Sequence, residues 1–127
     1  MIKKNKIAIH HNKNSFSDRW IEYCLKHNVS YKIVDCLSRN ISDDLKDCNA
    51  LMWHFTHIQF DQHIRAKEII KYLEKLGVPV FPNYSSMFHY DDKIAQKSLL
   101  ESINAPLIPT HIFFNREDAI EWSNTIN

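Results

Sequence analysis

The stretch ALMWHFTHIQFDQHIRAKEIIKYLEKLGVPVF (residues 50–81) predicts a strand, a helix and a second strand in succession. Its first six residues are nearly all apolar, which is typical of a strand buried on both faces of a parallel sheet. In the middle of the stretch, apolar side chains recur at helical spacing with charged residues between them: Ala66, Ile69, Ile70, Leu73 and Leu76. Gly77 stands where a left-handed helix end is expected, and residues 78–81 then form the second strand.

The residues upstream repeat this alternation. Residues 6–11 and 31–36 are short β-rich runs, and a helix between them begins at a cap on Ser15 or Ser17 and extends to about Lys26. The polar segment after the second run predicts one or two helical turns. Alternating strands and helices predict an α/β fold, in which right-handed crossovers build a parallel sheet with helices on both faces. We therefore expect a small, three-layer Rossmann-like domain with strand order 2-1-3-4.

After Pro82 the alternation changes. A turn or short helix precedes a longer helix that Asp91 or Asp92 caps, and an apolar edge strand is expected within residues 105–114. Asn115, followed three residues later by an acidic side chain, opens a final helix as in a capping box. We divide the chain into an α/β domain at residues 1–90 and a helix–strand–helix extension at residues 91–127. Because the pattern stops without a helix end signal, we expect a truncated part of a longer protein.

The composition narrows the function classes. The chain has 127 residues and a net charge of +1, which argues against a strongly basic nucleic-acid-binding protein. No apolar run approaches the roughly 20 residues that would span a membrane. Three cysteines without a CxxC pair fit reduced thiols in a cytoplasmic protein. Gly77 is the single glycine, so the glycine-rich loops that bind phosphates through backbone amides are absent.

The candidate binding residues lie where the first and third strands end. In a parallel sheet of this order, ligands bind outside the carboxyl ends of the strands, at the switch point between those two strands. The side chains expected there are His10, His11, Asn12, Ser15, His54 and His57. We predict that they contact a substrate. Two imidazoles with a carboxylate such as Asp61 would instead suit a metal ion, although no metal-binding spacing signature is present. A third interpretation is that the rings hydrogen-bond strand-end carbonyls or line a solvated cleft.

Lys93 follows directly after the expected helix cap. A cation in the first turn faces the positive end of the helix dipole, which costs roughly 0.3–1 kcal/mol. By spacing alone, the favoured interpretation is a solvated stripe of Lys93, Lys97 and Glu101 on one side of the helix.

The same region resembles the junction that opens the ATP-grasp ligases, a superfamily that includes glutathione-synthetase-like and RimK-like enzymes. The matching residues, in chain order, are Phe81-Pro82-Asn83, Asp92-Lys93, Pro106, Pro109-Thr110 and Phe113-Phe114. The helix expected from residue 115 onward is similar to the helix that follows in those relatives. The chain therefore resembles a pre-ATP-grasp domain joined to the beginning of an ATP-grasp domain.

This resemblance implies a function. Lys93 would reach the phosphates of ATP, and the strand-end residues of the small domain, from His10 to Ser15 and from His54 to His57, would contact the substrate. The intact protein would use ATP and magnesium to convert a small-molecule carboxylate into an acyl phosphate and transfer the acyl group to an amine or thiol. The second ATP lysine, the glycine-rich flap and the magnesium ligands would lie in a missing C-terminal ATP-grasp domain.

The resemblance also limits what this chain would do by itself. We do not expect it to be catalytic alone, and a homodimer is compatible with the sequence. The alternative is a non-catalytic α/β module that binds a small molecule or a protein.

Overall fold

The computed structural model of the protein describes residues 6–55, 60–90 and 92–126. The chain forms two compact units, Met1–Phe88 and His89–Asn127, which we describe separately.

The first unit is built on a parallel sheet of four strands in the order β2-β1-β3-β4, which confirms the predicted fold class and strand order. The strands are β1 (Ile7–His10), β2 (Tyr31–Val34), β3 (Ala50–Met52) and β4 (Val80–Phe81). In the shared register, Ile9 of β1 lies between Ile33 of β2 and Met52 of β3. The first three strands are shorter than predicted at their carboxyl ends, because the chain leaves the hydrogen-bonded ladder there and enters the connecting loops.

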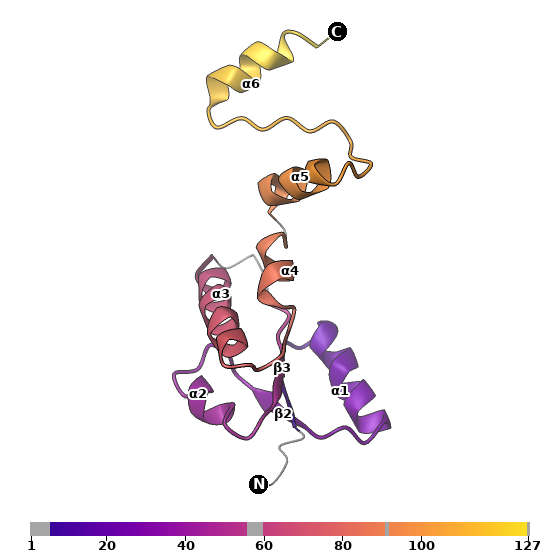
Figure 1. Ribbon diagram of the computed structural model, residues 1–127, viewed down its shortest axis with the longest axis vertical. Coiled ribbons are helices and arrows are strands. Elements are labelled where there is room, and N and C mark those ends of the chain that lie inside the picture. The colour runs from indigo at the N-terminus through magenta and orange to yellow at the C-terminus, as the bar shows by residue number, and fades with distance from the viewer. Residues whose placement is uncertain (1–5, 56–59, 91, 127) are drawn as a thin grey trace. The chain divides into compact units, whose positions relative to one another are not determined.

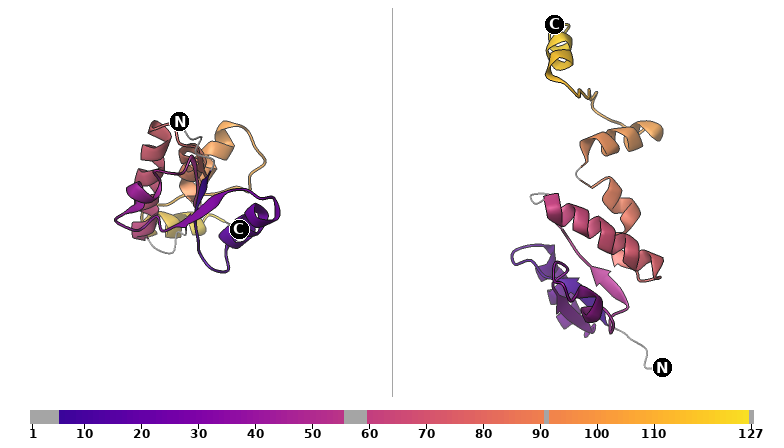
Figure 2. Two further views of the ribbon diagram at one scale, coloured as in Figure 1. Left: turned by 90° about the horizontal axis from the view of Figure 1, so that it is seen from below. Right: turned by 90° about the vertical axis from the view of Figure 1, so that its left-hand side faces the viewer.

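Helices cover both faces of this sheet. Figure 1 shows the strands between α1 on one side and α2 and α3 on the other, and the views in Figure 2 agree. The helices of this unit are α1 (Phe16–Lys26), α2 (Ile41–Asp44), α3 (Phe60–Lys75) and α4 (Tyr84–Phe88). The crossover from β2 to β3 therefore has only one turn of helix, whereas the crossover from β3 to β4 carries a helix of 16 residues.

The main core lies between the sheet and α3. Leu51, Trp53 and Phe55 point to that side and are each 1% exposed, and they belong to the same buried cluster as Ala66 and Ile70 of α3. The residues that alternate with them along the chain are only half-buried. From the sequence, residues 50–55 are expected to be buried on both faces of the sheet. Burial is complete only on the face that packs against α3.

The face of the sheet that α1 covers is less completely buried. Ile9 in the centre of the sheet is fully buried, but Ile33 on β2 is 53% exposed and Phe81 on β4 is 59% exposed. The Trp20 ring of α1 lies edge-on to Phe81, with 6.1 Å between the ring centroids. A single helix thus covers the middle of this face and leaves its two outer strands partly open.

The ends of the helices follow their predicted signals. Ser15 caps α1 by accepting a hydrogen bond from the Ser17 amide. At the end of α3, Gly77 has φ 76°, and the Val78 amide donates to the Leu73 carbonyl at 3.0 Å. This bond satisfies a carbonyl that the helix leaves without an internal partner.

The second unit contains α5 (Lys93–Ser102) and α6 (Arg116–Ser123). Asp92 caps α5 by accepting from the amides of Ile94 and Ala95, and the Asn115 side chain accepts from the Asp118 amide at the start of α6. Asp91, the other cap candidate, lies outside the described residues.

The prediction of an edge strand within residues 105–114 is wrong, because this segment has no regular secondary structure. A strand needs a neighbour for its amides and carbonyls, and the described part of this unit offers none. Separately, no helix in the described residues is long and apolar enough to cross a membrane.

Replacing Gly77 tests the end of α3. Gly77→Ala places a side chain in the left-handed region and should lower the free energy of unfolding by about 1 kcal/mol. No heavy atom lies within 4 Å of the added Cβ, so the cost comes from the backbone and not from a clash. Gly77→Asn is the control, because asparagine tolerates this conformation and should cost less. Urea unfolding measures both, and equal stability of the alanine variant and the parent would contradict the assignment.

Candidate functional site

The carboxyl edge of the sheet brings two of the predicted segments together. Because β1 and β3 are neighbours, the segment after His10 and the segment around His54 leave the sheet side by side. The half-buried ring of His54 contacts Phe16 of α1, with 4.6 Å between the ring centroids. His57, the last of the predicted set, lies outside the described residues.

His10 lies below this edge, in the core. It is 7% exposed, and its ring packs against Trp53 with 5.4 Å between centroids. Its Nδ1 accepts a hydrogen bond from the Cys36 amide at 3.0 Å. The ring therefore ties β1 to the chain after β2, which gives His10 a structural role, and its predicted contact with a substrate stays a prediction.

The surroundings of His10 favour the neutral imidazole. Burial lowers the pKa of His10 below its usual value, and the neighbouring His11 acts in the same direction. Asp35 opposes this shift, with its Oδ1 atom 3.9 Å from Nδ1. The hydrogen bond from Cys36 also requires Nδ1 to be an unprotonated acceptor, which agrees with the direction of the shift.

A buried hydroxyl organises the loop after β1. Ser17 is 1% exposed, and its Oγ accepts from the Asn12 amide and donates to the Asn12 carbonyl, both at 2.9 Å. The Nδ1 atom of His11 lies 3.0 Å from the same oxygen. Ser17 thereby positions the predicted residues His11 and Asn12, although the sequence suggested it only as an alternative helix cap.

The loop ends at an open hollow in front of α1. This hollow has a volume of about 770 Å³ and contains two of the predicted residues, Ser15 and His54. Its other lining residues are Asn14, Phe16, Asp18, Arg19 and Glu22. His11 and Asn12 lie beside it and are half-buried.

The charges around this hollow have both signs, because Arg19 faces it together with Asp18 and Glu22. One carboxylate oxygen of Asp18 is already hydrogen-bonded, because its Oδ2 accepts from the Asn14 amide at 2.8 Å. Sequence reasoning missed Arg19 and Glu22, although their spacing on the first turns of the predicted helix carried the signal. The arrangement suits a small polar molecule that carries both charged and hydrogen-bonding groups.

In the described part of the chain, no three His, Cys, Asp or Glu side chains come close enough to hold a metal ion together. The metal interpretation of the histidines therefore has no geometric support among these residues.

Lys93 belongs to the second unit, where it is the first residue of α5 and is exposed. Its Nζ donates to Oε1 of Gln96 at 3.2 Å, and the Gln96 amide group in turn donates to the His89 carbonyl at 2.9 Å. Farther along the helix, Lys97 pairs with Glu101, as the predicted solvated stripe requires. Lys93 thus stands apart from that pair, at the positive end of the helix.

The buried imidazole predicts a pH effect on stability. Folding lowers the pKa of His10 below its unfolded-state value of 6.5. The stabilisation that comes from the neutral imidazole is therefore fully present above pH 6.5, and it is lost as the pH falls toward the folded-state pKa. The free energy of unfolding should fall by up to about 1.4 kcal/mol per pH unit in that window. His10→Asn keeps an acceptor for the Cys36 amide and should flatten the dependence. His27→Gln, at an exposed position, is the control and should leave the pH dependence of stability unchanged. A steep pH dependence that persists in His10→Asn would contradict its assignment to His10.

Removing the buried hydroxyl should loosen the loop. Ser17→Ala leaves both polar groups of the Asn12 backbone without their partner and should cost about 1–3 kcal/mol. Hydrogen exchange at the Asn12 amide should accelerate. Ser15→Ala removes a helix cap and the 3.2 Å contact between the Ser15 and Ser17 hydroxyls, but it keeps both bonds of Ser17 to the Asn12 backbone. It should cost about 1 kcal/mol and leave that amide protected. Equal exchange at Asn12 in both variants would show that Ser17 does not hold the loop.

We compared the chain with models of known protein families and with curated proteins. No family model matches it, and no curated protein matches it.

Proposed function

We propose that this chain is the N-terminal portion of an ATP-dependent ligase of the ATP-grasp type, which joins a carboxylate to an amine or a thiol. The observation that carries the proposal is the order of elements along the chain. A parallel 2-1-3-4 sheet ends in Phe81-Pro82-Asn83, and a helix capped by Asp92 with Lys93 at its first position follows. The sequence resembles that family at the same residues.

The position of Lys93 supports a phosphate-binding role. Its ammonium group is exposed at the end of α5 where the helix dipole is positive, and both charges favour an anion. A lysine at this place is mildly unfavourable for the helix itself, so a phosphate ligand supplies a reason for it. Nucleotide binding by side chains also agrees with a sequence that has a single glycine.

The surface of the second unit supports its assignment to a larger domain. None of its described residues is buried. Large apolar side chains stand in solvent instead, among them Ile103 at 62%, Ile108 at 83% and Phe114 at 86% exposure. Apolar surface of this extent is typical of a segment that packs against further protein. In the proposed ligase, that further protein is the remainder of the ATP-grasp domain.

The hollow at the carboxyl edge is the proposed substrate site. His54 and Ser15 line it, and His11 and Asn12 are held beside it. ATP would supply the phosphoryl group that activates the substrate carboxylate. The residues of this chain would bind and orient the two partners: Lys93 at the phosphates of ATP and the edge residues at the substrate. Magnesium ligands are assigned to the further domain.

The proposal predicts the effect of one substitution at α5. Lys93→Ala in the protein made from the complete reading frame should weaken ATP binding by about tenfold or more, because it removes a charge-assisted contact. Calorimetry measures the affinity. Lys97→Ala lies one turn along the same helix and is the matched control, which should retain the affinity. Thermal unfolding of Lys93→Ala should stay close to that of the parent, since Lys93 is exposed, whereas Lys97→Ala loses the pair with Glu101 and should cost about 0.3–0.5 kcal/mol.

Two outcomes would overturn the proposal. Unchanged ATP affinity in Lys93→Ala would remove the phosphate role of that residue. Magnesium-dependent release of phosphate from ATP by the 127-residue chain alone would contradict a division of the catalytic groups between this chain and a further domain. If the complete protein does not bind ATP, the interpretation as a non-catalytic binding module replaces the ligase.

A further inference from the structure

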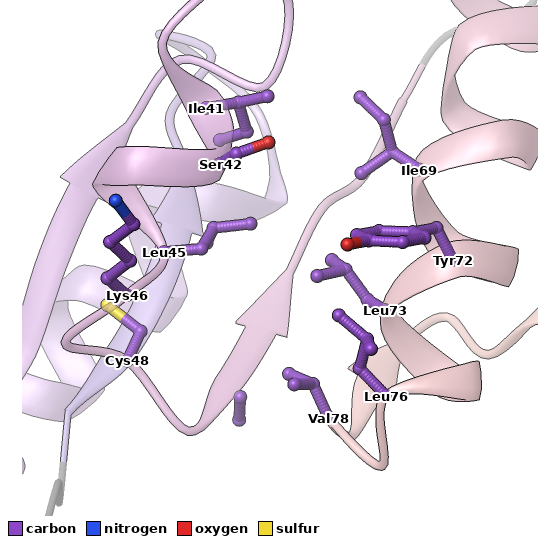
Figure 3. Close-up of a pocket in the computed structure, with 11 residues that line it drawn as sticks. Ile41, Ser42, Leu45, Lys46, Cys48, Ile69, Tyr72, Leu73, Leu76 and Val78 are labelled. Atoms are coloured by element: carbon purple, nitrogen blue, oxygen red, sulfur yellow. The ribbon is translucent and has the colours of Figure 1, made fainter.

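A second concave surface lies at the opposite edge of the sheet from the proposed substrate site. It is a groove between α2 and α3 with a volume of about 400 Å³ (Figure 3). Residues that precede or begin strands border it, including Cys48 and Ala50 at the start of β3 and Val78 before β4. These positions place the groove at the amino-terminal edge of the sheet, within the first unit.

The groove follows from the unequal length of the two crossovers. α2 has only four residues and cannot cover the side of α3 that faces it. Ile41, Cys48 and Leu73 form a floor and are 6–7% exposed, whereas Tyr72 and Leu76 form a wall and are 58% and 59% exposed. Apolar side chains thus stay in contact with water along about two turns of α3.

The chemistry of the lining selects the ligand. Most of the lining residues are aliphatic, so ordered water would find few hydrogen-bond partners there. In Figure 3, Leu45, in the turn after α2, and Tyr72 of α3 point toward each other across the groove, and Lys46 lies along its α2 side. Among the described residues that line the groove, Lys46 carries the only formal charge. A complementary ligand has an aliphatic body and one negative charge.

The ammonium group of Lys46 is accessible to such a ligand. It pairs with Asp43, three residues earlier in the chain, and both side chains are highly exposed, at 75% and 73%. An exposed pair between near neighbours contributes little to stability, so exchange of Asp43 for a ligand carboxylate costs little. The volume of the groove also falls within the range of small-molecule sites, about 300–1,000 Å³.

We propose that the groove between α2 and α3 is a binding site for an aliphatic monocarboxylate, with the alkyl chain between Leu45, Tyr72 and Leu76 and the carboxylate at Lys46. This site is separate from the substrate site at the carboxyl edge and does not depend on the ligase assignment. A ligand that binds only the folded chain also raises its stability, in proportion to the logarithm of ligand concentration above the dissociation constant.

The test uses the full chain and decanoate as the probe, followed by heteronuclear NMR. Decanoate should shift the amide signals of residues 41–50 and 69–78, the two segments that line the groove. 1-Decanol and decylammonium should bind about tenfold more weakly, since neither places a negative charge at Lys46. Saturable binding of decanol or decylammonium with the affinity of decanoate would overturn the carboxylate assignment.

Two pairs of variants locate the site. Lys46→Gln should weaken decanoate binding about fivefold to tenfold, whereas Lys75→Gln, an exposed lysine of α3 outside the lining, should not change it. Leu76→Glu should abolish binding, because it places a negative charge in the wall of the groove. Leu25→Glu on α1, at 63% exposure, is its control. Both leucines are exposed, so both variants should fold.

Three results would overturn the proposal: no saturable binding of decanoate, amide shifts confined to residues away from the groove lining, or equal loss of binding in Leu25→Glu and Leu76→Glu. Sedimentation velocity separates a remaining explanation. A dimer that dissociates in Leu76→Glu but not in Leu25→Glu would show that a second copy of the chain covers the groove, and this too would replace the proposed ligand.

Discussion

The packing of β3 against α3 is the contact on which the rest of the first unit depends. Leu51, Trp53 and Phe55 place large side chains on one face of the sheet, and Ala66 and Ile70 of α3 close over them. Burial of one such side chain contributes about 1.5–3 kcal/mol. The Trp53 amide still donates to the Phe81 carbonyl at 2.9 Å, and the row continues to Phe55, so packing holds the last part of the chain at the carboxyl edge.

The proposed substrate site is an extension of this core. The Trp53 ring supports His10, and the imidazole of His10 holds the Cys36 amide, so that the ends of β1, β2 and β3 are linked below the surface. Ser17 then ties α1 to the loop that follows β1. Polar groups that are buried and fully hydrogen-bonded make a surface loop rigid. The hollow that Ser15 and His54 line therefore rests on a fixed base, although it is open to solvent.

The two edges of the sheet differ because the helices that flank it differ in length. At the carboxyl edge, polar loops and the start of α1 produce a hydrophilic hollow with charges of both signs. At the amino edge, the one-turn α2 leaves the aliphatic flank of α3 uncovered. The polar hollow and the apolar groove thus lie at opposite edges of the sheet. The second unit shows the same imbalance more strongly, since its apolar side chains have no core of their own among the described residues.

The sequence by itself determined the features that depend on near neighbours along the chain. Alternating strands and helices predicted the parallel sheet and its order, and the caps at Ser15, Asn115 and Gly77 lie where their signals placed them. The reason is that helix periodicity, capping and backbone conformation are set within a few residues. The same local patterns placed the candidate site at the carboxyl edge, because strand order determines which strand ends are adjacent.

Only the tertiary structure decided which of those residues lie at the hollow and which lie in the core. His10 and His11 are adjacent in sequence, yet one lies in the core and the other beside the hollow, because successive side chains of a strand point to opposite faces. The role of Ser17, the charges of Arg19 and Glu22 at the hollow and the groove beside α3 likewise depend on contacts between distant segments. The missing strand at residues 105–114 has the same cause. An apolar run becomes a strand only where another strand accepts its hydrogen bonds, and no pattern within the run can specify that partner.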